Sequence, residues 1–236
     1  MQFEPVKGFG ILLLYFVVCA AAALALRRFI SMPREVFRKL LHTILLGSIL
    51  VLTHAFQTWW YAAFASILFM LMVFPILAAA ESIPGYSQLL VERSNGEIKR
   101  SLVVVFSMFA VLITLCWGLL GEKYLVRASV FAWGFGDAAA ALVGKRYGKN
   151  FIEGRLVEGR KSLEGTLAMF VVAFFTILAV LIANSAVVWY GYLPTAAVTA
   201  AACAAVELYT KNGMDTLTCP LTAAAVLILL IRLWGV

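Results

Sequence analysis

The sequence predicts an all-α integral membrane protein, a single compact bundle of seven or eight transmembrane helices that forms one domain over residues 1–236. Two features of the composition carry this prediction: 64% of the 236 residues are hydrophobic and only 13% are charged. A soluble globular domain is nearer half apolar and a quarter charged, so a water-soluble fold and a disordered chain are excluded. Because one span needs about 20 apolar residues, the length allows about eight passes and no separate soluble domain.

Eight apolar runs are candidates for these spans. They cover residues 8–26, 40–56, 59–80, 101–120, 125–144, 164–183, 186–206 and 217–235. The first is not a cleaved signal peptide, because its positive charges, Arg27 and Arg28, follow the apolar stretch. The second and seventh runs are the weakest, which leaves seven spans as the alternative to eight. The four scattered cysteines form no C-x-x-C pair and are typical of buried membrane residues.

Basic residues are concentrated in alternate loops between these runs. If the N-terminus lies outside, the loops 27–39, 81–100, 145–163 and 207–216 face the cytoplasm and hold 15 of the 19 Lys and Arg residues. The positive-inside rule therefore predicts this orientation, with the motif-bearing loops on the cytoplasmic side. The net charge of +7 belongs to one membrane face, which argues against nucleic acid as a partner. Most acidic residues share that face, which suggests a polar site for a highly charged ligand.

The strongest local signal is a carboxylate above a stripe of small residues. At 100° per residue, Asp137 shares one helix face with Ala141, Gly144 and Gly148. Small residues let another helix or a ligand approach the backbone closely. An ionised Asp near the bilayer centre costs about 2.5–3.5 kcal/mol on insertion scales and needs a partner. The alternative is that these small residues only pack against a neighbouring helix, and that Asp137 is a buried polar residue with hydrogen-bond partners in the core.

A basic cluster follows at the exit of the same helix. Lys145, Arg146 and Lys149 are suited to phosphate oxygens. A buried acid such as Asp137 beneath these side chains is the arrangement that holds Mg²⁺ against the phosphates of a nucleotide.

The next loop orders glycines before a lysine and a serine. The run Gly154-x-x-x-x-Gly159-Arg160-Lys161-Ser162 differs from a Walker A loop by one inserted Arg, and no strand pattern precedes it, which excludes a P-loop fold. The glycines nevertheless leave backbone N–H groups available to bind a phosphate, and the side chains of Lys and Ser are suited to bind phosphate and a metal ion. A solvated loop would explain the charges but not this order. Lys161, Glu164 and Gly165 share one face of the helix that begins here.

Two further clusters flank other runs. Arg38 and His42 lie one helical turn apart, beside Lys39, and either bind an anionic ligand or anchor lipid headgroups, with His42 as a core residue in the second interpretation. Glu207 ends the seventh run, and Asp215 starts the eighth after an Asn-Gly turn. Asp215 either caps that helix or is a second carboxylate for Mg²⁺, which usually takes one or two carboxylates plus phosphates and water.

Together these motifs resemble the membrane-bound polyprenol kinase family, which includes dolichol, phytol and farnesol kinases and the CTP-dependent diacylglycerol kinase, and which is related to the CTP:phosphatidate cytidylyltransferases. Four elements carry the resemblance, in the family's order. They are Arg38-Lys39-Leu-Leu-His42, Gly136-Asp137 with Gly144 and Gly148, Lys161-Ser162-Leu163-Glu164-Gly165-Thr166, and Glu207 with Asp215-Thr216-Leu217-Thr218-Cys219-Pro220. Thr216 departs from the Asn that is common there, which puts a contact from that side chain in doubt.

The resemblance implies Mg²⁺-dependent phosphoryl transfer from CTP to the hydroxyl of a membrane lipid alcohol, such as phytol, farnesol or a polyprenol. It implies catalytic roles for Asp137, Lys161 and Glu164, and metal binding by Asp137, Asp215 and Glu207. The nucleotide-binding residues would be Arg38, Lys39, His42, Gly136, Gly144, Lys145, Arg146, Gly148, Lys149, Lys161, Ser162 and Gly165.

Three alternatives of function stay open at this point. A cytidylyltransferase would transfer CMP instead of phosphate, and a diacylglycerol kinase would phosphorylate a different lipid. An ion-coupled transporter would use Asp137 and Asp215 as ion ligands, but its intramembrane charges should lie near mid-bilayer rather than at one end. The acceptor lipid, the choice between CTP, UTP and ATP, and the oligomeric state, a homodimer included, are not encoded in these motifs.

Overall fold

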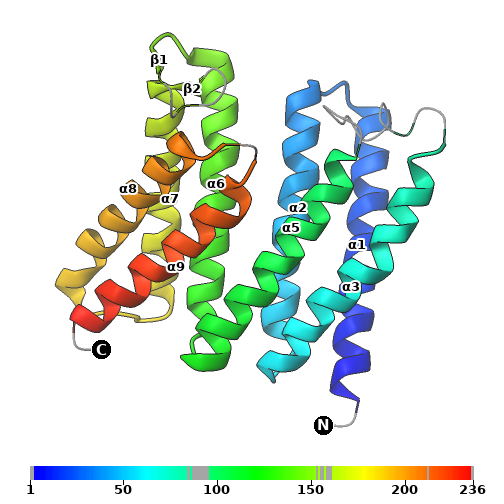
Figure 1. Ribbon diagram of the computed structural model, residues 1–236, viewed down its shortest axis with the longest axis horizontal. Coiled ribbons are helices and arrows are strands. Elements are labelled where there is room, and N and C mark those ends of the chain that lie inside the picture. The colour runs from blue at the N-terminus through cyan, green and yellow to red at the C-terminus, as the bar shows by residue number, and fades with distance from the viewer. Residues whose placement is uncertain are drawn as a thin grey trace. The chain divides into compact units, whose positions relative to one another are not determined.

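The computed structural model describes residues 3–83, 86, 96–152, 154, 157, 161–211 and 213–234, and most of them are helical (Figure 1). Within these residues, eight helices are long and apolar enough to cross a membrane. This finding confirms the helical membrane class and favours eight spans over seven. The helices are α1 Glu4–Phe29, α2 Arg34–Ala55, α3 Trp59–Ala80, α5 Glu97–Leu112 with the π-helix η1 Ile113–Leu119, α6 Lys123–Tyr147, α7 Leu163–Ala183, the 3₁₀-helix η2 Trp189–Gly191 with α8 Tyr192–Tyr209, and α9 Asp215–Leu233.

The helices extend beyond the apolar runs that predicted them. Helix α2 begins at Arg34, directly after Pro33, and so includes a charged first turn ahead of the run 40–56. Helix α6 likewise continues to Tyr147 and includes Lys145 and Arg146. Long basic side chains can lay their apolar stems along the helix and keep the charge in water, so charged turns belong to the same helices.

The chain divides into two compact units, Met1–Leu119 and Leu120–Val236. The expected single domain therefore stays a prediction. In the first unit, α1 packs against α2, and α3 packs against α5 and η1. Its core contains stacked aromatic rings, with Phe69 4.5 Å from Phe16 and 4.8 Å from Phe106 between ring centroids.

The second unit is a ring of four helices. Helix α6 packs against α7 and α9, α7 against α8, and α8 against α9. Most buried positions of α8 are small, among them Ala200, Cys203 and Ala204, and small residues let membrane helices approach closely. The loop between α6 and α7 contains a short antiparallel pair, β1 Phe151–Ile152 and β2 Lys161–Ser162, in which Ile152 lies opposite Lys161.

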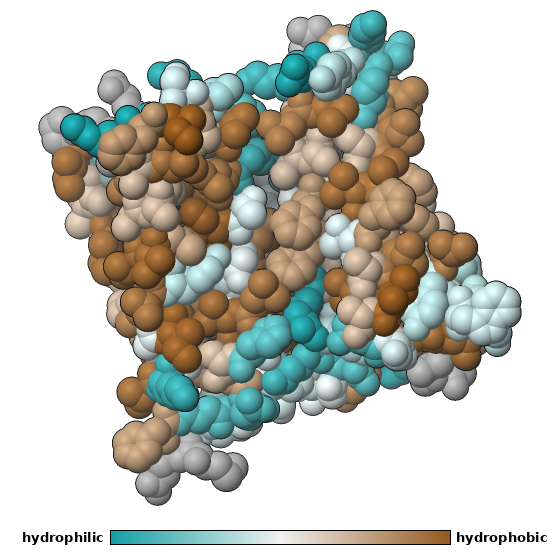
Figure 2. Space-filling model, turned by 180° about the vertical axis from the view of Figure 1, so that it is seen from behind, coloured by the Kyte–Doolittle hydropathy of each residue, from teal (hydrophilic) through white to brown (hydrophobic). Residues whose placement is uncertain are grey.

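On the face that Figure 2 shows, hydrophilic residues gather toward the ends of the helices and hydrophobic residues cover much of the surface between them. In the first unit, the Arg38 guanidinium lies 3.0 Å from the Glu97 carboxylate and joins the starts of α2 and α5. In the second unit, the Lys161 ammonium lies 3.0 Å from the Glu207 carboxylate and joins the α6–α7 loop to the end of α8. Each unit thus brings its motif-bearing segments to one end, and their placement in the cytoplasm stays a prediction.

Candidate functional site

Three helices of the second unit and the strand β2 each contribute one charged group to the same region. Asp137 lies on α6, Lys161 directly precedes α7, Glu207 lies in the last turn of α8, and Asp215 opens α9. Asp137 and Asp215 are close enough to Glu207 to act electrostatically on its carboxylate, as is Lys161. The structure therefore brings together the three carboxylates and the lysine that the sequence singled out.

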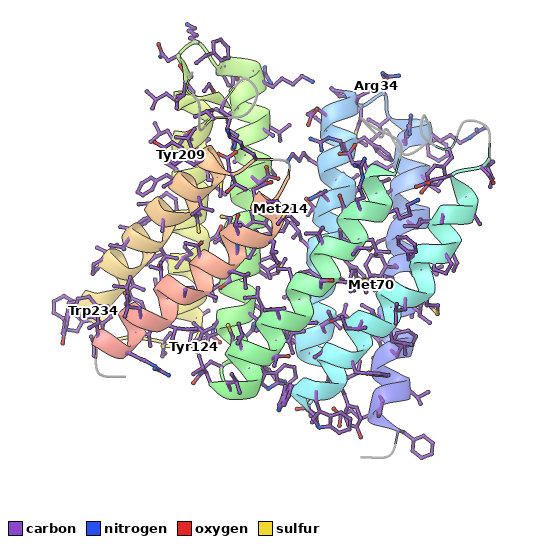
Figure 3. The ribbon with its side chains drawn as sticks, viewed as in Figure 1. Arg34, Met70, Tyr124, Tyr209, Met214 and Trp234 are labelled. Carbon is purple, nitrogen blue, oxygen red and sulfur yellow. The ribbon has the colours of Figure 1, made fainter. Side chains whose placement is uncertain are left out.

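The geometry of α6 explains how Asp137 reaches this cluster. Asp137 is half-buried and lies ten residues before the last residue of α6, Tyr147, which corresponds to about 15 Å of helix. In Figure 1, α6 extends past the connection between α8 and α9. That connection is flanked by Tyr209 at the end of α8 and Met214 just before α9, both of which Figure 3 labels. The electrostatic interaction between Asp137 and Glu207 places the end of α8 beside the part of α6 that contains Asp137.

Lys161 is held by two acceptors of one residue. Its Nζ donates to Glu207 Oε1 at 3.0 Å and also to the backbone oxygen of Glu207. The last carbonyl groups of a helix lack intrahelical partners and carry the negative end of the helix dipole. Lys161 thus caps α8, and two of its three N–H donors are engaged. Both side chains are largely buried, with Lys161 22% and Glu207 12% exposed.

The four glycines of the motifs lie along the contact between α6 and α7. A Cβ atom on Gly144 would lie 3.2 Å from Ser162 Oγ, and one on Gly136 would lie 3.2 Å from Met169 Sδ. Gly148 lies against the same serine, and Gly165 lies against Gly144. The structure therefore gives these residues a packing role, which was the alternative interpretation of the sequence. Their direct contact with a nucleotide stays a prediction.

We expect a methyl group on Gly165 to disrupt this contact between α6 and α7. A Cβ there would lie 3.0 Å from the backbone oxygen of Ala140, which cannot rotate away. Gly165→Ala should lower the stability of the protein in detergent by about 1–3 kcal/mol, measured as a reduced melting temperature. Gly10→Ala is the matched control, because Gly10 is also helical and has no heavy atom within 4 Å of an added Cβ. Equal melting temperatures for the two variants would contradict the close packing of α6 against α7 at Gly165.

Ser162 and Glu164 fix the start of α7. Ser162 Oγ accepts a hydrogen bond from the Gly165 N–H at 3.1 Å, so the serine is the N-cap of the helix. The Glu164 carboxylate accepts from the backbone N–H of Asn150 at 3.1 Å and from its side-chain amide at 2.9 Å. Sequence reasoning missed Asn150, because a contact across 14 residues of loop leaves no periodic signal.

The remaining predicted nucleotide contacts are basic. Lys145, Arg146 and Lys149 are exposed at the end of α6, where the Arg146 guanidinium lies 5.3 Å from the centre of the Tyr147 ring. Their exposure suits an anionic ligand, and their contact with one stays a prediction.

Arg38 belongs to an ion-pair network in the first unit. Its guanidinium binds the carboxylates of Glu35 and Glu97. Lys39 is buried in the same turn of α2, and His42 is half-buried one turn further on. The charge of Arg38 is therefore engaged within the protein, and nucleotide binding by Arg38, Lys39 and His42 stays a prediction.

The second unit contains carboxylates that could form part of a Mg²⁺ site, and binding of the metal stays a prediction. Over the residues that the structure describes, no group of three or more His, Cys, Asp and Glu side chains is arranged to hold a metal ion by itself. Mg²⁺ does not require such a group, since it usually binds one or two carboxylates and completes its shell with phosphate oxygens and water. Asp137 and Asp215 can supply these carboxylates, whereas Glu207 is engaged with Lys161.

The fold and the site define a multi-pass helical membrane protein with a charged site at one end of a four-helix unit. The chain is 30% identical over 230 residues to a phytol kinase of Synechocystis sp. (strain ATCC 27184 / PCC 6803 / Kazusa), a match that covers 92% of this chain and 88% of the relative. The protein belongs to the polyprenol and phytol kinase family. No family model and no solved structure matches the chain. The wider relationship to dolichol kinases and cytidylyltransferases stays a prediction.

Proposed function

We propose that this protein is a membrane-embedded kinase that transfers the γ-phosphoryl group of CTP to the hydroxyl of an isoprenoid alcohol, with Mg²⁺. The observation that carries the proposal is the convergence of three carboxylates from apolar helices with Lys161 from the strand before α7; the carboxylates are Asp137, Glu207 and Asp215. Charged groups are costly inside a membrane bundle, and such residues mark functional sites. The family member, a phytol kinase, supports an isoprenoid alcohol as the acceptor.

The proposed acceptor fits the surroundings of the cluster. Directly after Lys161 and Ser162, α7 presents a stripe of exposed apolar side chains at every fourth position. These are Leu163, Leu167, Val171 and Phe175. A prenyl tail could stay in lipid beside this stripe while its hydroxyl reaches the charged cluster at the helix end.

Lys161 is the proposed phosphate-binding group. Phosphoryl transfer depends mostly on positioning and on stabilising charge at the phosphate oxygens. Glu207 holds the ammonium in place through its carboxylate and its backbone oxygen, and the third N–H is left for a phosphate oxygen. Exposed Arg146 and Lys149 would add charge for the outer phosphates.

Asp137 is the proposed acceptor of the alcohol's proton. Asp137 belongs to the charged cluster, whereas Glu164, the other candidate, accepts hydrogen bonds from Asn150 at the start of α7. Asp137 and Asp215 would hold Mg²⁺, which would neutralise charge on the transferred phosphate.

The decisive experiment incubates the purified protein in nanodiscs with γ-labelled CTP and Mg²⁺. The acceptors are phytol, farnesol, a polyprenol and diacylglycerol, each tested alone. We expect label on an isoprenoid alcohol, more label from CTP than from ATP, and loss of activity with EDTA.

Each alternative function predicts a different result in this assay. Pyrophosphate release from CTP and phosphatidate, without a labelled alcohol, would establish a cytidylyltransferase. Label on diacylglycerol alone would establish a diacylglycerol kinase. A transporter would turn over no nucleotide, and CTP with Mg²⁺ would leave its melting temperature unchanged.

A further inference from the structure

Asn150 joins the two ends of the connection between α6 and α7. Its backbone oxygen accepts a hydrogen bond from the N–H of Leu163 at 2.9 Å. Its backbone N–H and its side-chain amide both donate to Oε1 of Glu164, at 3.1 Å and 2.9 Å. A residue that follows α6 therefore binds the first two residues of α7 through three of its polar groups.

These contacts lead directly to Lys161. Strand β1 begins at the residue after Asn150, and its Ile152 pairs with Lys161 in β2. The next residue of β2, Ser162, is the N-cap of α7. The backbone of Lys161 thus lies between the strand pair and the helix start, which Asn150 holds together (Figure 1). From this position the Lys161 side chain reaches Glu207 on α8.

The strand pair alone is a weak constraint on Lys161. Each strand has only two residues, and an isolated two-stranded pair is marginally stable at best. A shift of the pairing by one residue would turn the Lys161 side chain to the other face, away from Glu207. Asn150 precedes β1 and Glu164 follows β2, so the contact between them fixes the register of the pair.

We infer that Asn150 and Glu164 are positioning residues, which act by holding Lys161 where it meets Glu207. Glu164 then serves as a hydrogen-bond acceptor for Asn150 and not as the acceptor of the alcohol's proton. This role rests on the proposed function, in which Lys161 binds a phosphate of the nucleotide. The placement of Lys161 can nevertheless be measured without catalysis.

The first measurement is the rate at which acetic anhydride acetylates Lys161 in the purified protein, followed by mass spectrometry. The reaction should be slow in the wild type, because the ammonium is 22% exposed and is held by Glu207. Glu164→Ala should raise the rate about ten-fold and Asn150→Ala about three-fold, since surface hydrogen bonds to a charged group are modest in strength and Asn150→Ala keeps its backbone donor. Exposed Lys211 is the internal reference and should react at the native rate in each variant.

The second measurement is a mutant cycle in the kinase assay. Glu164→Ala and Asn150→Ala should raise KM for CTP by about the same factors, because only the fraction of molecules with Lys161 in place binds CTP well. At saturating CTP, kcat should stay close to the native value. The double variant should match Glu164→Ala, because the two side chains act through one contact. Glu164→Gln keeps an oxygen acceptor and should resemble the wild type.

Asn184→Ala is the matched control for these variants. Asn184 lies at the opposite end of α7, and its side-chain amide donates to the backbone oxygen of Val180 at 2.7 Å. The change removes the same amide group from a contact with the same helix. Acetylation of Lys161 and KM for CTP should both keep their native values in this variant.

Two outcomes would overturn the positioning role. One is native acetylation of Lys161 in Glu164→Ala, or an increase that Lys211 shares, which would indicate general loosening. The other is a loss of kcat by about 10²-fold or more in Glu164→Gln with native acetylation, which would make Glu164 a catalytic acid or base. Selective exposure of Lys161 in a protein that phosphorylates no alcohol would support the positioning role and refute the proposed function.

Discussion

Replacing Asp137 by asparagine should lower kcat for phosphate transfer by about 10²- to 10³-fold, the usual loss when a group that stabilises the transition state is removed. The amide has nearly the same size but cannot accept the alcohol's proton and carries no charge to offset Mg²⁺. Asp137 is half-buried, and a neutral amide costs less in a membrane bundle than an ionised carboxylate. The variant should therefore fold with an unchanged or higher melting temperature.

The Asp137→Asn experiment needs a control on the same helix. Glu122→Gln removes a carboxylate at the opposite end of α6 and should leave kcat unchanged. The concentration of Mg²⁺ for half-maximal activity gives a second measurement, which should rise for Asp137→Asn and for Asp215→Asn. A folded Asp137→Asn protein with the native rate would show that this cluster is not the active site.

The helical class and the approximate positions of the spans could be predicted, because they depend on the composition and length of the apolar runs. Apolar runs of the required length have one stable form in a bilayer, whereas the charged first turn of α2, from Arg34, lies ahead of the predicted run 40–56. The sequence also indicated which residue types form the site. An Asp inside an apolar run costs free energy in the membrane, so it is expected to have a function.

The partners within the site could not be predicted, because they depend on contacts distant in sequence. Lys161 and Glu207 are 46 residues apart, and no periodicity connects them. The sequence placed Glu207 among metal ligands, whereas the structure pairs it with the lysine. Gly144 and Gly165 could equally line a ligand groove or a helix contact, and only their mutual position distinguishes these roles. The β1–β2 pair that fixes Lys161 is too short to leave a strand pattern.

Replacing Lys161 by methionine should lower kcat/KM for CTP by about 10²- to 10³-fold, because it removes the positive charge that stabilises the phosphate oxygens. Methionine keeps the apolar stem of the side chain, so packing against the end of α8 is preserved. Lys211→Met, which removes an exposed lysine four residues after Glu207, is the control and should retain the native kcat/KM.

Glu207→Gln then separates two roles for this glutamate. If Glu207 positions Lys161, the variant should raise KM for CTP about ten-fold, since one charged hydrogen bond is weakened while the backbone oxygen still holds the ammonium. Its Mg²⁺ requirement should match that of the wild type, because the metal ligands are untouched. If Glu207 is instead a metal ligand, the half-saturating Mg²⁺ concentration should rise as it does for Asp215→Asn, and KM for CTP at saturating Mg²⁺ should recover. The structure favours the first result, because both oxygen acceptors of Lys161 come from Glu207, and an ammonium held at that carboxylate disfavours a cation beside it.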